Sequence, residues 1–379
     1  MAQGQHTVKK DKRGPFAIVL SVIVFLMLAA AVFLYANSAV GFYGTKQSRG
    51  AFNAFDDLAK DSVDVVFIGS SATSRYFIPG KAYNDEGFAS FELAAPSTPL
   101  IFADNIMDLV QETQSPELYV VELRNVLDGY NAVDETSVRK VTDSIKVTKR
   151  ERYEMINEAL DVMAEHAPEG SYDTEAMNYY FPVIKYHNRL TAADNDSHLK
   201  GKELLLRGSY NKMQGFQYSD PTLTKVAQKV PHYVEESAEL DPDIEEIVGN
   251  LLDYCDKLDA QVVFTFSPFV MSEEKSAMSN AIADYVESRG YTCLNFNSFK
   301  MADELGLDWS SDFYNTNHCN FQGSEKYTDY LENYISSHYD LPDHRGDSSY
   351  VAWEESYKKY EDYVADGILY VSDKNVSDE

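Results

Sequence analysis

The sequence predicts an α/β domain built around a parallel sheet of five strands. Helical patterns alternate with apolar runs of strand length, for example at 100–111 and at 242–258, where Asp241 precedes Pro242 as an expected N-cap. Strands that alternate with helices in this way pair in parallel. The runs are compact and rich in β-branched and aromatic residues, as buried parallel strands are, and they occupy 64–68, 89–93, 118–123, 261–266 and 291–296.

The N-terminus carries an uncharged apolar stretch, from Phe16 to Tyr35, that is long enough to cross a bilayer as a helix. We predict that residues 16–36 span the membrane and contact its lipids. Basic residues precede the stretch, so the positive-inside tendency places residues 1–15 in the cytoplasm and everything after Val40 outside the cell. A cleaved signal peptide is the alternative, since the small residues at 36–39 suit a peptidase.

The composition argues against several classes of function. The formal net charge is -28, and the basic N-terminal cluster stays inside, so the exported part is at least that acidic and nucleic acid is not expected as a partner. The three cysteines form neither a disulfide framework nor a zinc pattern, and such low cysteine use fits an exported bacterial protein. No sequence cluster indicates a metal, and no motif indicates a cofactor.

The exported chain divides into three parts. We predict one α/β domain over 62–340, interrupted at about 127–240 by a polar, helix-rich insert that breaks the alternation of strands and helices. The last part, 341–379, is acidic and rich in tyrosine. It either packs as a peripheral helix or stays mobile, with 368–371 as its one candidate strand.

Two polar segments carry side chains suited to nucleophilic catalysis. The first strand ends at Gly69-Ser70-Ser71, and an open parallel sheet places its ligand site at the carboxyl ends of its strands. His318 lies in a late polar loop just before a helix, and a histidine at the same sheet edge would act as the base for a serine. Each has a structural alternative: a serine-rich turn that caps a helix, and a histidine that only stabilises its loop.

Together these segments resemble the SGNH/GDSL hydrolase superfamily, whose nucleophile ends a GDS-like motif after the first strand and whose base ends a late DxxH motif. More narrowly, they look like the branch that includes the D-alanyl transfer protein of lipoteichoic acid biosynthesis, which is anchored by one N-terminal helix and faces outward. The resemblance covers roughly 63–125 and 261–331, and it implies a three-layer flavodoxin-like SGNH fold. The segments that carry it are GSSATSRYFIP, FELAAPSTPL, PELYVVELRN and FYNTNHCNFQGSEKYTDYL.

The resemblance implies that Ser71 is the nucleophile and His318 the general base, with Ser70 a bystander or a backbone donor. Asn315 stands where the family motif has its aspartate, and an amide does not stabilise an imidazolium as an anion does. In a serine-protease triad this exchange lowers turnover about ten-thousand-fold, largely through the wrong histidine tautomer. Three alternatives follow: a Ser-His dyad oriented by a backbone carbonyl, a carboxylate such as Asp312 in the orienting role, or slow chemistry.

The family's oxyanion-binding glycine and asparagine are not cleanly matched. The expected contributors are the backbone of Ala72 in the helix after the nucleophile and Asn125 after the third strand, the latter as an amide donor. Glu122 and Arg124 flank the same strand end and are assigned either to substrate binding or to a mutual salt bridge.

We therefore expect an extracytoplasmic esterase or O-acyltransferase that acts through an acyl-enzyme. Its expected substrate is an acyl ester on an envelope glycan or polymer, and the family resemblance suggests a membrane-bound O-acyltransferase as its partner. The alternative is an SGNH-fold accessory, weak or inactive in catalysis, that binds a cell-surface glycan or an acyl carrier.

Overall fold

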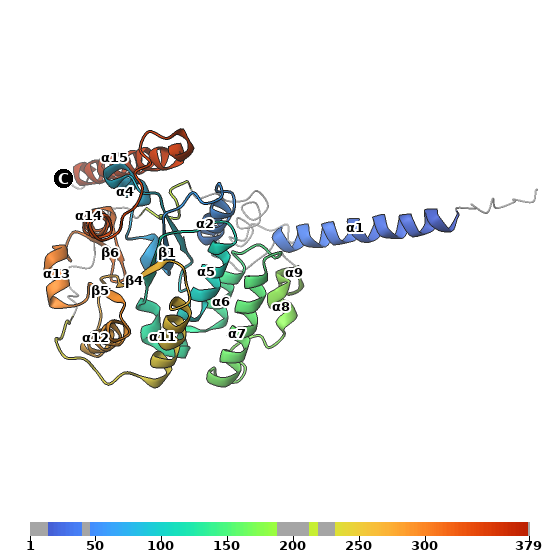
Figure 1. Ribbon diagram of the computed structural model, residues 1–379, viewed down its shortest axis with the longest axis horizontal. Helices are drawn as coiled ribbons and strands as arrows, with labels where there is room; N and C mark the ends of the chain where they lie inside the picture. Colours follow the sequence, from blue (N-terminus) through green and yellow to red (C-terminus); the bar gives the residue numbers. More distant parts are fainter. Residues whose placement is uncertain (1–13, 40–45, 188–211, 219–231, 378–379) are drawn as a thin grey trace, which may run out of the picture.

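The computed structural model describes residues 14–39, 46–187, 212–218 and 232–377. A five-stranded parallel sheet, in the order β2-β1-β3-β4-β5, lies between layers of helices (Figure 1). All four strand pairings are parallel, as the alternation of strands and helices predicts. The strands are β1 (Val65–Gly69), β2 (Ser90–Ala94), β3 (Leu118–Glu122), β4 (Gln261–Phe266) and β5 (Thr292–Asn295), which confirms all five strand predictions.

Side chains alternate between the two faces of the sheet and so build two hydrophobic clusters. Along β1, Val66 and Ile68 belong to the larger cluster, whereas Val65 and Phe67 belong to the smaller one. Both faces are therefore buried, which is why the strands are apolar without interruption. The larger cluster takes side chains from α2 (Lys46–Asp56), α5 (Ala103–Gln111), α7 (Arg150–His166), α11 (Pro242–Cys255) and α12 (Glu273–Ser288), and the smaller one from α13 (Phe299–Leu305) and α14 (Phe321–His338).

The two helices expected from sequence are both present, with small differences at their ends. The first begins as a 3-10 turn, η1 (Leu100–Phe102), and continues as α5. The second, α11, is capped by Asp241, whose carboxylate accepts from the backbone N–H groups of Asp243 and Ile244, with Pro242 in the first turn.

The expected insert is helical over most of 127–187, the first of its described parts. After η2 (Arg124–Ala132) come α6 (Glu135–Thr142), α7, α8 (Ala176–Tyr180) and α9 (Pro182–Tyr186). Residues 188–211 and 219–231 of the insert lie outside the described part. Between them, 212–218 runs beside the free edge of β2, where the Gln214 carbonyl accepts from the Glu92 N–H and the Gln217 N–H donates to the Ser74 carbonyl.

The C-terminal part packs as a peripheral helix, α15 (Val351–Ser377), preceded by η5 (Ser348–Tyr350). The candidate strand at 368–371 is wrong, because those residues belong to α15. Trp353, Ser356 and Tyr360 are buried at helical spacing, and the Trp353 indole donates to the Ser90 carbonyl at 2.9 Å. Gly80 on α4 (Pro79–Glu86) permits the close approach of α15, because a Cβ there would lie 2.6 Å from the Tyr357 backbone nitrogen.

The apolar N-terminal stretch forms α1 (Pro15–Ala39), which extends away from the domain (Figure 1). Its segment Pro15–Asn37 is long and apolar enough to cross a membrane, and the most apolar stretch of this segment is not buried against the described part of the domain. A membrane anchor and a signal sequence share these properties. The predicted cytoplasmic segment 1–15 lies outside the described residues except for Gly14 and Pro15.

Candidate functional site

Ser71 lies immediately after β1, in the turn that leads into the short helix α3 (Ser71–Ser74). Ser70 has extended backbone angles and caps this helix, with its hydroxyl accepting from the Ala72 N–H at 3.2 Å. The Ala72 N–H, which was predicted as an oxyanion donor, therefore bonds to the Ser70 hydroxyl. This contact does not involve the Ser70 backbone N–H, so the role of Ser70 as a bystander or a backbone donor stays a prediction. Ser71 itself is half-buried, at the carboxyl edge of the sheet.

Gly69 is required by the close packing of this turn. A Cβ at that position would lie 2.3 Å from the Thr73 hydroxyl and 2.8 Å from the Glu122 Cβ. Real Cβ atoms do not approach other atoms so closely, so the turn accommodates only glycine without movement. The turn thereby packs directly against Glu122 at the end of β3.

His318 reaches Ser71 from a small antiparallel hairpin, β6 (Phe313–Asn315) and β7 (His318–Cys319). The His318 Nε2 atom lies 2.8 Å from the Ser71 Oγ, although the residues are 247 apart in sequence. This is hydrogen-bond distance for a nucleophile and its base. The structure therefore brings together the two residues that the sequence analysis selected.

Asn315 faces the other imidazole nitrogen, with its Oδ1 atom 3.1 Å from His318 Nδ1. The same Oδ1 accepts from the Asn317 backbone N–H at 2.8 Å, and because a backbone N–H only donates, this contact fixes which end of the amide faces the imidazole. An oxygen at that place requires a proton on Nδ1, which leaves Nε2 free to accept from the serine. Asn315 thus selects the tautomer that a general base needs.

Asp312 does not orient His318. Its buried carboxylate accepts from the Asp308 N–H and pairs with Lys326, both at 2.7 Å. The prediction that Asp312 could take the orienting role is therefore wrong: the carboxylate stabilises the loop before β6 and the start of α14.

The hairpin is held against the sheet by contacts around the Asn317 carbonyl. The Arg124 guanidinium donates to this carbonyl at 2.7 Å, and the Tyr76 hydroxyl lies 2.9 Å from it and 2.6 Å from the Pro268 carbonyl. On the neighbouring residue, the Thr316 carbonyl accepts from the Val270 N–H at 2.8 Å. Elements from three strand ends therefore position the turn that carries His318.

Two guanidinium groups make the surroundings of His318 positive. The pKa of His318 is lowered to about 3, first by burial and then by the charges of Arg124 and Arg75. Arg124 lies over the Phe269 ring at 4.9 Å, and Arg75 lies over the Tyr314 ring at 5.7 Å. The imidazole is consequently neutral at physiological pH, the form in which it accepts a proton.

Glu122 and Arg124 do not form the salt bridge that the sequence analysis weighed. The Glu122 carboxylate accepts from the backbone N–H groups of Arg124 at 3.1 Å and Ser267 at 3.3 Å, and burial raises its pKa. The Asn125 amide donates one of its hydrogens to the Thr98 carbonyl at 2.9 Å, a contact that holds the loop after β2. That hydrogen is therefore not free to bind an oxyanion, the role that had been predicted for it.

Arg75, Tyr76 and Phe269 have no role that was predicted from the sequence. The first two lie within the segment that follows the nucleophile, where an arginine next to a tyrosine was a detectable signal. Phe269 follows β4 with no distinguishing pattern, and only the tertiary structure brings it under Arg124.

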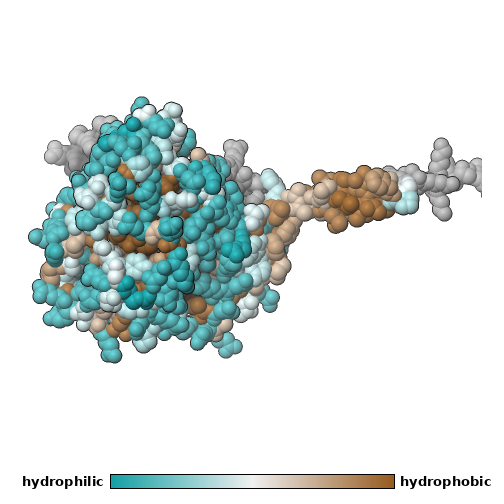
Figure 2. All heavy atoms as spheres, viewed as in Figure 1, coloured by the Kyte–Doolittle hydropathy of each residue, from teal (hydrophilic) through white to brown (hydrophobic). Residues whose placement is uncertain are grey.

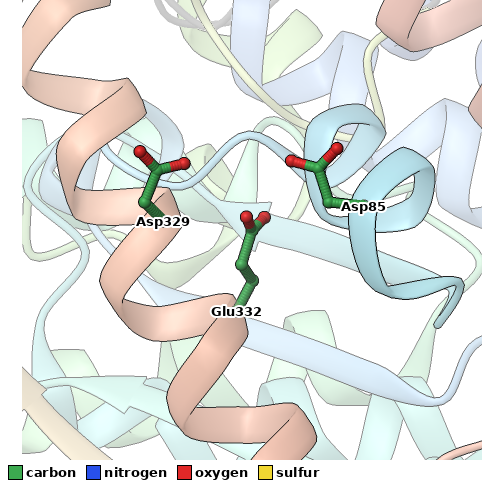
Figure 3. Close-up of side chains that lie close together, drawn as sticks. All are labelled: Asp85, Asp329 and Glu332. Atoms are coloured by element: carbon green, nitrogen blue, oxygen red, sulfur yellow. The ribbon is translucent and has the colours of Figure 1, made fainter.

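A second charged cluster lies away from this site, between α4 and α14. The carboxylates of Asp85, Asp329 and Glu332 point toward one another, as Figure 3 shows. The Lys81 ammonium contacts all three, at 2.5, 2.5 and 2.9 Å respectively, and so supplies the cation of the cluster. Among the described residues, this is the one group of acidic side chains with metal-ligand spacing, and lysine already neutralises part of its charge.

Comparison of the chain with protein-family models and with curated proteins gives no match.

Proposed function

We propose that this chain is an extracytoplasmic, serine-dependent esterase or O-acyltransferase of the SGNH type, anchored by α1. The observation that carries the proposal is the 2.8 Å contact between Ser71 Oγ and a neutral, correctly tautomerised His318. The strand order β2-β1-β3-β4-β5 supports it, because flavodoxin-like sheets with this order bind ligands at the carboxyl ends of β1 and β3. Ser71 and Arg124 follow those two strands.

In the first half of the proposed reaction, His318 Nε2 takes the proton of the Ser71 hydroxyl while Oγ attacks the carbonyl carbon of an ester. The carbonyl π electrons move to oxygen, which becomes an oxyanion. When the tetrahedral intermediate collapses, the bond to the leaving oxygen breaks, and that oxygen receives the proton from Nε2. The product is an acyl-serine at Ser71.

In the second half, His318 Nε2 takes a proton from the acceptor hydroxyl, which attacks the acyl-serine. The bond from the acyl carbon to Ser71 Oγ breaks, and Oγ takes the proton back. Water as acceptor makes the protein an esterase, whereas a sugar or polyol hydroxyl makes it a transferase. Exclusion of water from the acyl-enzyme separates the two outcomes.

The positive surroundings of His318 affect both halves. Arg124 and Arg75 oppose the imidazolium that forms in each step, yet the same charges favour the oxyanion that forms with it. Imidazolium and oxyanion arise together as a neutral pair, so the opposing effects partly cancel. A low pKa of the free histidine is therefore compatible with its role as a base.

The proposed substrate is an acyl ester on an envelope glycan or polymer. The apolar helix α1, interpreted as the anchor of an outward-facing domain, and the resemblance to the lipoteichoic acid branch support this class. On the same grounds, a membrane-bound O-acyltransferase is the proposed partner that delivers acyl groups.

The test is intact-mass measurement of the full chain in detergent after exposure to a fluorophosphonate probe. We expect one adduct on the wild type and none on Ser71→Ala or His318→Ala. Ser74→Ala is the matched control, because the Ser74 hydroxyl is buried without a hydrogen-bond partner among the described residues, so its loss should not affect labelling.

The second candidate is a non-catalytic accessory that binds a glycan or acyl carrier. The observation that favours it is Asn315 in place of the family's aspartate, because no carboxylate of the described residues contacts the His318 ring. A folded wild type that stays unlabelled would support this candidate and exclude the activated serine.

A further inference from the structure

The N-terminal helix makes a specific contact with the domain through α8 and α9. The ring of Phe181, between these helices, packs edge-on against Phe33 of α1 with centroids 5.1 Å apart. One turn further along α1, the Asn37 side chain, which is buried, accepts from the Val183 N–H at 3.1 Å. The end of α1 therefore has a fixed neighbour in the domain.

The helices that contact α1 also expose large apolar side chains. Met177 on α8 is 49% exposed and Ile184 on α9 is 41% exposed. Outside α1, the described part of the chain exposes three other large hydrophobic side chains, Phe299, Val351 and Tyr363, which belong to α13 and α15. Figure 2 shows the hydrophobic surface of α1 continuing onto the adjoining margin of the domain.

The length of α1 sets the depth of this surface in a membrane. About 20 helical residues cross the hydrocarbon core, and α1 has 25, so its last turn reaches the boundary between acyl chains and headgroups. Phe33 and Asn37 lie in the last two turns, and they are the residues that contact α8 and α9. The exposed side chains of those helices therefore lie at the level where apolar and aromatic residues enter an interface.

We propose that α8 and α9 form a second membrane contact, with Met177 and Ile184 entering the headgroup–acyl boundary of the bilayer beside α1. This inference rests on the anchor in the proposed function. A single spanning helix can tilt in the bilayer and carry the domain with it, whereas a second contact fixes which side of the domain faces the lipid. The carboxyl edge of the sheet, with Ser71, then has one orientation toward membrane-bound substrates.

The test is site-directed spin labelling of the full chain in vesicles of phosphatidylcholine and phosphatidylglycerol. Nitroxides are placed at Met177→Cys and Ile184→Cys, and in matched controls at Phe299→Cys and Val351→Cys, which are 55% and 47% exposed on α13 and α15. The three native cysteines are buried, so the labelled wild type gives the background. Collision rates with oxygen and with a water-soluble nickel chelate report the surroundings of each label.

We expect high oxygen and low nickel collision rates at Met177 and Ile184, and the reverse at both controls. High nickel rates at all four positions would overturn the proposal, because the surface would then face water. Low rates of both collisions at Met177 and Ile184 would also overturn it, in favour of a protein partner on this surface. If intact mass shows that the chain has lost residues 1–39, the anchor itself fails, independently of whether Ser71 is labelled by fluorophosphonate.

Discussion

Replacement of Asn315 by aspartate and by leucine separates two effects of the residue that faces His318. In the wild type, the Asn315 oxygen at 3.1 Å from Nδ1 sets the tautomer but adds no full charge. Aspartate keeps an oxygen at that place and adds a negative charge. Leucine has a similar volume and removes the acceptor.

The charge effect can be estimated from the geometry. Two unit charges about 4 Å apart interact by about 4 kcal/mol at an effective dielectric constant of 20. This corresponds to a rise of about 3 units in the pKa of His318, less the cost of desolvating the new carboxylate. A stronger base accelerates proton transfer, so we expect Asn315→Asp to increase the rate of fluorophosphonate labelling by roughly ten- to a hundredfold at pH 7.

The leucine variant loses the hydrogen bond that favours the Nδ1–H tautomer. Such a bond contributes about 1–1.5 kcal/mol, so labelling should slow by roughly tenfold. Nitrogen-15 NMR of the imidazole measures tautomer and pKa directly, and labelling kinetics by intact mass measure the nucleophile. If Asn315→Leu labels as fast as the wild type, or if Asn315→Asp leaves the pKa of His318 unchanged, the assigned role of Asn315 is refuted.

Further predictions test the surroundings of the pair and the core beneath it. Arg124→Gln should raise the pKa of His318 above the wild-type value of about 3, so that labelling is lost at a higher pH as the solution is acidified. Arg124→Lys keeps the positive charge and should keep the low pKa. Equal NMR titration midpoints for His318 in the two variants would contradict this. Tyr76→Phe and Tyr83→Phe each remove a hydroxyl that donates to a carbonyl, and each should lower the free energy of unfolding by about 1–2 kcal/mol. Only Tyr76→Phe should slow labelling, since Tyr83 donates to the distant His344 carbonyl. Equal slowing in both variants would exclude a positioning role for Tyr76. Glu92 is fully buried, and among the described residues neither of its carboxylate oxygens has a partner. Burial raises its pKa far above the ordinary value, so the free energy of unfolding should fall as pH rises above about 4.5. Glu92→Gln should remove that part of the fall in urea titrations at pH 5 and pH 8.

Strand positions were predictable because the sheet is buried on both faces. Each strand then consists of consecutive apolar residues, a pattern that does not depend on which strand lies beside it. The C-terminal part shows the limit of this reasoning. The apolar run at 368–371 has strand composition, but α15 continues through it from residues that pack on α4, and tertiary contact overrides a weak local preference.

The reactive pair was predictable for a topological reason, and its surroundings were not. A residue directly after a parallel strand lies at the carboxyl edge of the sheet, which placed Ser71 from its sequence position alone. The partner of His318 Nδ1 was left open between Asn315 and Asp312, three residues apart in one loop. In the folded chain the Asp312 carboxylate pairs with Lys326 of α14 and does not contact His318. The sequence alone does not indicate that pairing.

The sequence by itself therefore determined the strands, the apolar N-terminal helix and the segment that presents Ser71, because each depends on local composition or on order along the chain. Only the tertiary structure decided that His318 meets Ser71 at 2.8 Å, that Asn315 sets its tautomer and that Arg124 and Arg75 lower its pKa. These properties depend on distances between residues that are far apart in sequence. Such distances follow from how the helices and loops pack on the sheet, which no local pattern specifies.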